Sequence, residues 1–590
     1  MKDGLAAEAY LLPYFAGRDS CDDAEGKAAR ATGFPIWNAR ELPEENAALQ
    51  LIRLRRTARD YATRGYFPVA LDGNALYLAT CRATPAFFAD TQQSYAPLSC
   101  RFVIASPKRL HAARVLAFRD KAADSAAHAL LKKSPHASAY RPAFGKRLYE
   151  KILAAAMLAC LFLSWEDFYA ALSYAAFATF SLALTLKTGL FVIGTRAFRR
   201  AAREEATGDD DALPVYSVIV PLYREAAVVP SLVAALRRLR YPPEKLDLHL
   251  LAEEDDAETQ DALAKEELPG YMSITTIPPS EPRTKPKACN FALPFLRGER
   301  VTIFDAEDDP HPDHLRAAAA AFASDEKKSL YALQGRLHFS NARDNYLTHW
   351  FALEYAAHFD ALLWGMQRLD LPVALGGTSN HFRYRDLTSM GGWDPYNVTE
   401  DADVGMRVYR RRKKTRVLFA VTEERAPKEV AIWLKQRSRW IKGHLQTSMV
   451  HSRKPRAVVK RMGIWRFLGM HAFLSMPAAV YLLFPWPLAA WGWNVGACDF
   501  SGWCERASGG ISFHAGMALL VTGTALQSAM GVYAHCRFKG AWRRDAKGCA
   551  NAALMPLYTL FLVPAAYMAL RDLILAPYKW NKTPHEAPPP

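Results

Sequence analysis

The stretch VTIFDAEDD, residues 301–309, gives the strongest indication of the fold. Its opening residues, Val301 to Phe304, form the short continuous apolar run that is typical of a strand buried in a parallel sheet. Acidic residues begin where this run stops. On an extended segment Asp305 and Glu307 project to the same side, so two oxygen ligands converge where a divalent cation could bridge a diphosphate. The alternative interpretation is a solvated acidic turn.

The region around this stretch, residues 197–427, alternates strands with helices. A strand is expected at 215–220, a helix at 229–239 and a further strand at 246–251. This alternation predicts an α/β domain with a doubly wound sheet and helices on both faces. Ligands of such sheets bind at the carboxyl ends of the strands.

Two further acidic groups occur in the same region, at 253–256 after the second strand and at 399–403 before a basic helix. Three acidic groups that met in one place would repel each other without a metal ion or bound cationic side chains. The available cations include Arg283, Lys285 and Lys287, and also Arg437 with Arg439 in the stretch 436–440. The alternative for each basic cluster is a solvated or lipid-facing surface.

Apolar segments on both sides of this domain predict membrane helices. A spanning helix needs about 20 residues, and residues 146–196 contain two apolar blocks that suggest a helical hairpin with basic flanks. The excess of basic residues at its ends predicts that both flanking domains face the cytoplasm. Residues 428–462 form a basic amphipathic stretch that is expected at the membrane interface. Residues 463–577 contain the C-terminal membrane helices, and their number of crossings remains open.

The nine cysteines contain no CxxC pair and no zinc-type spacing. The non-basic linker at 494–510 is expected outside the cytoplasm. There Cys498 and Cys504 either pair in an oxidising compartment or stay reduced, and the sequence leaves both alternatives open.

Length and composition are consistent with a membrane protein that also carries soluble domains. The chain has 590 residues, 51% of them hydrophobic, and a formal net charge of +16. Such a charge suits a partner with phosphates or an acidic membrane face. Residues 1–145 mix short apolar runs with charged helical stretches, which predicts a small cytoplasmic N-terminal α/β domain. The first residues do not form a secretory signal.

The order of the motifs resembles that of membrane-embedded family 2 glycosyltransferases of the cellulose, hyaluronan and curdlan synthase type, and most of all bacterial phage-adsorption-type glycosyltransferases. The resemblance covers roughly residues 148 to 585. The motifs that carry it are IVPLYRE at 219–225, KPKACN at 285–290, DAE at 305–307, GGT at 376–378, TED at 399–401 and QRSRW at 436–440. The tail, residues 578–590, resembles the WxKTxH ending of bacterial synthases in this group.

This resemblance implies a GT-A domain that binds a UDP-sugar donor, inserted between transmembrane helices. The first-strand motif and an acid after the second strand would hold the nucleotide, with Glu253 and Glu254 both left as candidates for that acid. Asp305 and Glu307 match the metal motif for Mg²⁺ or Mn²⁺. The other substrate-binding residues implied at the donor are Pro221, Tyr223, Glu225, Lys285 and Asn290.

The resemblance also implies the catalytic and acceptor-binding residues. Asp401 matches the general base that would take the proton of the acceptor hydroxyl, so the reaction would invert the anomeric centre. Glu400 precedes it in the same motif. Gly377 and Thr378 correspond to the loop that lines the acceptor site. Gln436 and Arg439 would contact the diphosphate, and Trp440 would stack on the acceptor sugar or only anchor an interfacial helix.

The N-terminal domain resembles the domain that precedes the ATPase core in type II secretion ATPases. The resemblance rests on Phe67-Pro68-Val69, Val103 to Pro107 and Ser134 to Ala139. Some members of that group bind cyclic di-GMP, so cyclic di-GMP or a protein is a candidate partner. No run matches their nucleotide motif, which favours docking or structural support.

The sequence therefore predicts a processive, inverting enzyme that polymerises a UDP-sugar into an exported exopolysaccharide of the biofilm type. It would sit in the bacterial inner membrane as a multi-pass protein, with the growing glycan as acceptor and an outer-membrane or periplasmic export partner. Nucleic acid is not an expected partner. The alternatives are a non-processive transferase that glycosylates a lipid carrier, and a membrane receptor or scaffold with an inactive transferase domain.

Overall fold

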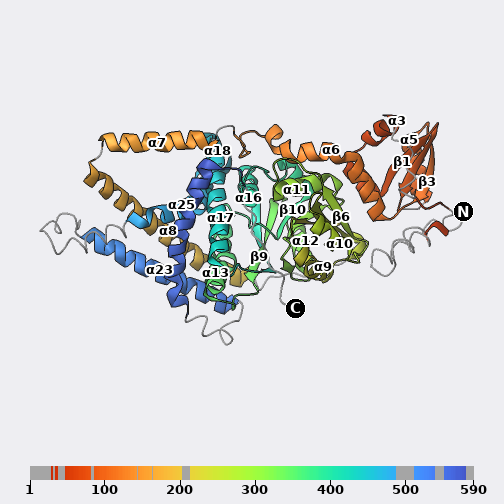
Figure 1. Cartoon of the computed structure of the whole chain (residues 1–590). Helices are drawn as coiled ribbons and strands as arrows, with labels where there is room; N and C mark the ends of the chain where they lie inside the picture. The colour runs from red at the N-terminus through yellow and green to blue at the C-terminus, as the bar shows by residue number, and fades with distance from the viewer. Residues whose placement is uncertain are drawn as a thin grey trace.

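The computed structural model describes residues 28–30, 34–37, 47–81, 85–141, 144–162, 164–201, 213–486, 511–538 and 551–579. Figure 1 shows three parts in a row: a small N-terminal sheet with its helices, a large central sheet, and a bundle of long helices at the far end. The predictions for Cys498, Cys504 and the WxKTxH ending lie outside the described residues.

The N-terminal part is a three-stranded sheet packed against helices. β1 (Tyr66–Asp72) and β2 (Ala75–Thr80) form an antiparallel hairpin, and β3 (Ser99–Ile104) pairs parallel with β2. Gly73 occupies the hairpin turn at φ +54°, a left-handed conformation that glycine adopts without a steric penalty. The helices are α3 (Ala47–Leu54), α4 (Ala58–Arg64), α5 (Pro85–Tyr95) and the long α6 (Pro107–Lys133).

The central sheet has eight strands in the order β6-β5-β4-β7-β10-β9-β11-β8. The strands are β4 (Tyr216–Leu222), β5 (Leu246–Glu253), β6 (Met272–Ile277), β7 (Arg300–Ile303), β8 (Asp309–Pro310), β9 (Leu330–Phe339), β10 (Asn380–Arg383) and β11 (Lys414–Glu424). β6, β5, β4 and β7 run parallel to each other, whereas β10 is antiparallel to both of its neighbours. The strands at 215–220 and 246–251 are found where the sequence predicts them, but the sheet as a whole is mixed.

Helices cover both faces of this sheet, as predicted. One cluster of buried apolar side chains joins the sheet to α9 (Val229–Arg237) and α12 (His314–Ala323). A second cluster, on the other face, includes α11 (Lys285–Ala292), α15 (Tyr384–Met390) and α16 (Glu400–Arg410). The remaining short elements of this region are α10 (Ala257–Ala264), η2 (Ala226–Val228), η3 (Pro243–Lys245) and η4 (Leu293–Phe295).

The helix bundle combines the long helices on both sides of the central domain (Figure 1). Its members are α7 (Phe144–Phe162), α8 (Trp165–Ala201), α13 (Tyr346–Ala357), η5 (His358–Leu362), α14 (Leu363–Arg368), α17 (Val430–His451), α18 (Pro455–Met462), α19 (Ile464–Leu474), α20 (Met476–Leu483), α23 (Ile511–Phe538), η6 (Ala552–Leu554) and α25 (Met555–Leu575).

Two helical segments of the described chain, Ala171–Ala201 and Ala552–Leu575, are long and apolar enough to cross a membrane. The pair α19 and α20 passes the same test only together, and the two helices are bent by 41° at their junction. The first half of the predicted hairpin, α7, is not among these segments, because basic and acidic residues occupy its first two turns. The second half of the hairpin, within α8, does meet the test.

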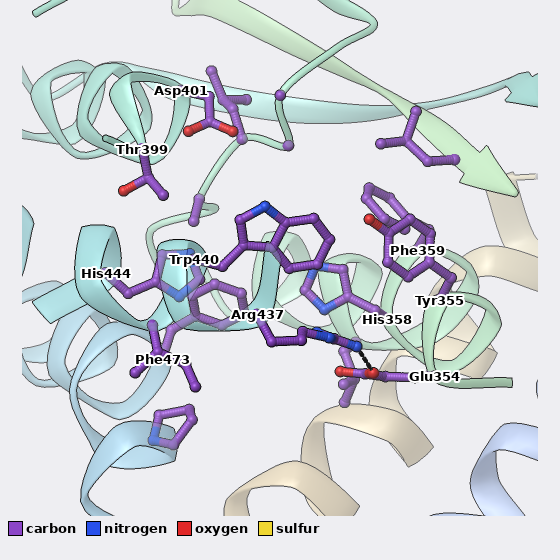
Figure 2. A pocket seen from close by; sticks show the side chains of 18 of the residues that line it. Glu354, Tyr355, His358, Phe359, Thr399, Asp401, Arg437, Trp440, His444 and Phe473 are labelled. Carbon is purple, nitrogen blue, oxygen red and sulfur yellow. Dashed lines mark hydrogen bonds and ion pairs between the residues drawn. The ribbon is translucent and has the colours of Figure 1, made fainter. Parts of the chain in front are cut away.

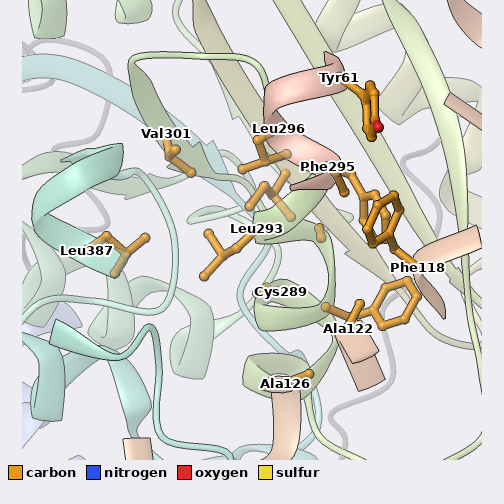
Figure 3. Close-up of a cluster of buried hydrophobic side chains, with 14 of the residues drawn as sticks. Tyr61, Phe118, Ala122, Ala126, Cys289, Leu293, Phe295, Leu296, Val301 and Leu387 are labelled. Carbon is orange, nitrogen blue, oxygen red and sulfur yellow. The ribbon is translucent and has the colours of Figure 1, made fainter. Parts of the chain in front are cut away.

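The N-terminal part is joined to the central domain by a shared apolar core. Figure 3 shows Phe118, Ala122 and Ala126 of α6 against α11 and the turn that follows it. Tyr61 of α4 contributes to the same cluster. Helix α6 therefore packs directly against the face of the sheet that α11 covers.

Candidate functional site

One cavity of about 1330 Å³ extends from the carboxyl ends of the central strands into the helix bundle. All but two of the predicted site residues line it. The exceptions are Glu254 and Asn290, neither of which is in its lining. We call the part at β4, β5 and β7 the donor end. The part between α8, α17, α20 and α25 we call the membrane end, because α8 and α25 make up most of the two described segments that are long and apolar enough to cross a membrane.

The donor end is built from loops that follow parallel strands. Pro221, Tyr223 and Glu225 line the cavity at the end of β4, and Glu253 does so as the last residue of β5. Glu253 lies 3.5 Å from the Lys287 ammonium. Burial raises the pKa of Glu253, while the positive charge of Lys287 opposes this shift. A polar substrate held here would meet carboxylates at the place where α/β sheets bind their ligands.

The four acids at 253–256 have four different partners, which decides between Glu253 and Glu254. Glu254 points to helix α6, where its carboxylate lies 2.5 Å from the Arg119 guanidinium. Asp255 pairs with Arg283. Asp256 accepts a hydrogen bond from the backbone N–H of Thr259 and so caps α10. Of these acids only Glu253 lines the cavity.

The predicted substrate residue Asn290 also has a structural environment. Its side-chain amide donates to the carbonyls of Ala126, at 3.1 Å, and Trp393, at 2.8 Å. Its carbonyl accepts from the N–H of Trp393 at 2.9 Å. Gly392 makes room for this arrangement, because a Cβ atom there would lie 2.2 Å from Asn290 Oδ1. Asn290 therefore connects α6 to the loop before α16 and does not reach the cavity.

Three charged groups that are far apart in the chain converge around Gly377. The position that a Cβ atom would take there lies 3.7 Å from Asp401 Oδ2 and 3.8 Å from both Asp305 Oδ2 and Lys285 Nζ. Lys285 forms an ion pair with Asp305 and donates to the Gly377 carbonyl at 2.6 Å. Although burial works against a charged amine, Asp305 and Glu400 raise the pKa of Lys285. A donor diphosphate at this point would contact both the Lys285 ammonium and the Asp305 carboxylate of the metal motif.

Adjacent acids at the N-terminus of α16 differ in their protonation. Burial raises the pKa of Glu400 to about 8, helped by the nearby Asp401 carboxylate. Burial also raises the pKa of Asp401, to about 6. Asp401, whose pKa is raised less, is therefore the better candidate of the two to be ionised and accept a proton near neutral pH.

Helix α17 supplies the third group of side chains, Gln436, Arg439 and Trp440, all of which line the cavity. Burial lowers the pKa of Arg439, and Glu400, Asp401 and Asp305 oppose that shift. The Trp440 ring stacks on Tyr355, with their centroids 6.3 Å apart and their planes at 30°. Figure 2 shows Trp440 between Asp401 on one side and the Arg437–Glu354 pair on the other.

Small contacts fix α17 against the loop that carries Asp401. Gly443 lies so close to Thr399 that an added Cβ atom would sit 2.4 Å from its methyl group. The N–H of Val398 donates to the Gln446 side chain at 3.2 Å. The stacking Trp440 and the acid Asp401 are therefore held in one rigid unit.

Several lining residues were not identified from the sequence. Glu424 ends β11 beside the acids that follow β7, and burial together with the charges of Asp308, Glu307 and Asp305 raises its pKa. Its position at the end of an apolar strand is the signal that could have identified it. Glu354 and Tyr355 lie on α13, whose sequence shows no comparable pattern.

The acids beside β7 fit a divalent cation in charge and in ligand type. Asp305 and Glu307 line the cavity, with Asp308 and Glu424 next to them. Asp308 Oδ1 is buried and has no hydrogen-bond partner in the described part of the chain. Across the same residues no group of three or more His, Cys, Asp or Glu side chains is arranged to hold a metal by itself. Asp305 and Glu307 would therefore share a cation with oxygens of the bound diphosphate.

At the membrane end the lining is mostly apolar and comes from α8, α20, α23 and α25. It includes Leu186, Leu190, Val480, Met530 and Leu562. The polar exceptions include Glu354 and Arg437, which form an ion pair that Tyr558 also joins by hydrogen bonds to both. The cavity thus changes from charged to apolar along its length.

Comparisons with known proteins find similarity to glycosyltransferases. Residues 300–528 match the family model described as "Glycosyl transferase family group 2". The chain is 25% identical over 235 residues to the probable glycosyltransferase YdaM of Bacillus subtilis (strain 168), covering 39% of this chain and 56% of that protein. It is 28% identical over 275 residues to the beta-monoglucosyldiacylglycerol synthase of Trichormus variabilis, covering 45% of this chain and 56% of that protein. The chain thus spans little more than half the length of these relatives.

Among solved structures, the mannosyltransferase PcManGT from Pyrobaculum calidifontis, in complex with GDP-Man and Mn²⁺, aligns with a TM-score of 0.41 and 20% identity. The alignment covers 67% of this chain and 99% of PcManGT. By similarity, residues 300–528 therefore resemble family group 2 glycosyltransferases, and the named relatives are glycosyltransferases too.

Proposed function

We propose that this chain is an inverting glycosyltransferase that takes the sugar of a UDP-sugar and adds it to an acceptor entering from the membrane side. The observation that carries the proposal is the single cavity in which Asp305, Lys285, Asp401 and Trp440 meet and which continues between the membrane helices. Such a cavity lets a donor enter from the cytoplasm and lets the acceptor and product lie among helices.

At the donor end the chain's own charges would bind the nucleotide diphosphate. A Mg²⁺ or Mn²⁺ ion held by Asp305 and Glu307 would offset the charge of the leaving diphosphate. Lys285 and Arg439 line the same space and would stabilise the negative charge that develops on the leaving oxygen. Glu253, which lines the cavity, would accept hydrogen bonds from the nucleoside.

At the reaction centre Asp401 would accept the proton of the acceptor hydroxyl. The hydroxyl oxygen attacks the anomeric carbon from the face opposite the diphosphate, so the bond to the diphosphate oxygen breaks and the configuration inverts. The raised pKa of Asp401, about 6, favours this role because a base near the working pH both stays ionised and takes up a proton readily. Glu400, with a pKa of about 8, is unsuited to it at neutral pH.

We favour a processive enzyme of the bacterial inner membrane, whose acceptor is the growing glycan. Trp440 and Tyr355 form an aromatic surface beside Asp401, and the apolar face of a sugar ring suits such a surface whatever the position of its hydroxyl groups. The membrane end would then guide the polymer towards an exporting partner.

A second candidate, a single transfer onto a lipid, is favoured by the apolar lining of the membrane end. The named activity of several relatives, beta-monoglucosyldiacylglycerol synthase, supports the same alternative. The two candidates share the donor chemistry and differ in the product.

The test is a donor screen on the purified protein in lipid nanodiscs. UDP-sugars, with GDP-mannose as a comparison, are supplied with Mn²⁺ or with chelator, and nucleotide release and the product are measured. A polymer that stays in water supports processive synthesis, and a product extracted only into organic solvent supports transfer to lipid. If all donors fail to turn over although UDP binds, the inactive-scaffold alternative replaces both.

The matched pair Asp401→Asn and Glu400→Gln tests the assignment of the base. Asp401→Asn should reduce kcat by about 10³-fold, because it removes the proton acceptor but keeps the side-chain shape. Glu400→Gln resembles the protonated form that prevails at neutral pH, so its loss should be far smaller. Equal losses in the two variants would contradict the assignment.

A further inference from the structure

Helix α6 of the N-terminal part reaches the loop that forms the wall of the donor site. This helix has 27 residues and runs from the small sheet along the central domain (Figure 1). Its Arg119 pairs with Glu254 at 2.5 Å. The next residue towards the strand, Glu253, lines the donor end of the cavity. One peptide unit therefore separates a contact with the N-terminal part from a contact with the donor.

The same helix also packs against α11, which carries Lys285 of the cavity lining and the buried Lys287 that contacts Glu253. Asn290 of α11 donates to the Ala126 carbonyl of α6 at 3.1 Å. Phe118, Ala122 and Ala126 of α6 belong to the same apolar cluster as Cys289 and Phe291 of α11 (Figure 3). At the first turn of α11, Lys285 pairs with Asp305 and Lys287 with Glu253. Helix α6 therefore supports both sides of the Glu253–Lys287 contact.

We propose that the N-terminal part sets the donor affinity of the transferase through α6, with Arg119 as a positioning residue for the 253–256 loop. Arg119 does not line the cavity, so it acts on the donor only through Glu254 and the neighbouring Glu253. This inference rests on the proposed function for the identity of the nucleotide. A displacement of α6 would reach Glu253 and Lys287 together.

The charges involved make this connection separable from folding. Both side chains of the Arg119–Glu254 pair are partly exposed, at 37% and 41%. Such pairs contribute little to stability, so their reversal should leave the protein folded. Removing the apolar contacts of α6 would instead disturb the core that joins the two parts. The ion pair is therefore the better place to test coupling.

The experiment measures UDP affinity by calorimetry, with Mn²⁺, on the full-length protein in nanodiscs, together with donor KM and kcat. The variants are Arg119→Glu, Glu254→Arg and the double exchange. Each single variant should weaken UDP binding and raise the donor KM by about fivefold with kcat within about twofold, and the double exchange should restore most of the loss. Only the restored Arg119–Glu254 ion pair would explain recovery of UDP affinity in the double variant, because a general loss of structure would not be reversed by a second substitution.

The matched control is Arg64→Glu, which reverses the exposed Arg64–Asp90 pair, both members of which belong to the N-terminal part. UDP affinity in this control should equal that of the unmodified protein. Unchanged affinity in both single exchanges, or losses that the double exchange does not recover, would overturn the inference. UDP binding is measured without turnover, so this inference can be tested independently of sugar transfer. A protein that binds UDP but transfers no sugar would contradict only the proposed function.

Discussion

The donor end and the membrane end of the cavity differ in the chemistry of their side chains. At the donor end, acids and cations from β5, β7, α11 and α16 oppose each other across short distances, as Lys285 does with Asp305. At the membrane end, apolar side chains surround the Glu354–Arg437 pair. Charge can therefore recognise a ligand at the first end, whereas at the second it mainly connects helices.

This difference predicts opposite outcomes for substitutions at the two ends. A change at the donor end should alter the reaction and leave the stability of the fold nearly unchanged, since its groups face open space. A change in the ion pair at the membrane end should lower stability, since α13, α17 and α25 meet there through Glu354, Arg437 and Tyr558.

After Asp401→Asn, the largest effect on the reaction should come from Gly377→Ala. The added methyl group would lie 3.7–3.8 Å from Asp401, Asp305 and Lys285, which is ordinary contact distance, so the fold can accept it. It would however occupy the space where the sugar must meet Asp401. Because a misplacement of about 1 Å can cost roughly 10²-fold, kcat/KM should fall by about that factor with an unchanged melting temperature.

Gly189→Ala is the matched change at the membrane end. Gly189 also lines the cavity, but a Cβ atom there would have no neighbour within 4 Å. Steady-state kinetics and thermal unfolding of both variants make the comparison. If Gly189→Ala impaired transfer as strongly as Gly377→Ala, the reaction centre would not lie at the donor end.

The next effect is on stability and comes from the membrane end. Glu354→Leu removes the counter-charge of the buried Arg437 guanidinium, which should cost about 3 kcal/mol. Replacing both members, as Glu354→Leu with Arg437→Met, should restore most of the stability because no charge is then left buried. Denaturation in detergent measures both. A double variant no more stable than the single one would show that the pair contributes more than charge compensation.

The sequence predicts the donor end better than the membrane end for a physical reason. Apolar runs that stop at acids mark the ends of buried strands, so Asp305 and the acidic group at 253–256 could be located from local pattern alone. No local pattern marks Glu354, and nothing in the motif at 436–440 indicates that Arg437 pairs with it, since this contact joins helices that are distant in the chain.

The same reasoning explains what was misplaced at the donor end. Glu253 and Glu254 are adjacent in the sequence and differ only in which partner each one reaches, Lys287 or Arg119. Arg119 lies in another part of the chain, 135 residues away. The orientation of the Asn290 side chain is likewise determined by its hydrogen bonds to Ala126 and Trp393. Local spacing contains no information about such long-range contacts.

Strand direction is the feature of the fold that the sequence does not predict in the same way. A buried strand gives an apolar run whichever way it runs, so the parallel order of β4, β5, β6 and β7 followed from their helical connections. β10 follows a long helical excursion from β9 and enters the sheet antiparallel to both neighbours. The loop at Gly377 precedes β10, and this reversal is what brings it to the carboxyl ends of the parallel strands.

A smaller effect is expected from pH, and it again belongs to the donor end. Transfer needs ionised Asp401, whose pKa is raised to about 6, so kcat should fall about tenfold per pH unit below that value and level off above it. Above about pH 8 Glu400 ionises beside the diphosphate site, which should raise the donor KM. A pH profile of kcat and KM checks both limbs. An acidic limb near pH 4, the ordinary range of an aspartate, would contradict the buried environment of the base.

The smallest effect should come from Trp440, where the two ends meet. Trp440→Phe keeps an aromatic face beside Tyr355 and should raise the acceptor KM only about threefold, whereas Trp440→Ala removes the face and should raise it about tenfold. Hydrolysis of the donor, measured as slow UDP release without acceptor, should have the same rate in both variants, because the donor contacts are untouched.

Trp433→Phe is the control on the same helix. Trp433 is fully buried against Tyr558 and does not line the cavity, so this variant should have a lower melting temperature and an unchanged acceptor KM. Equal acceptor KM values in Trp440→Ala and in the unmodified protein would mean that Trp440 packs the helix and does not hold the acceptor, and the acceptor would then have to contact other groups along the cavity.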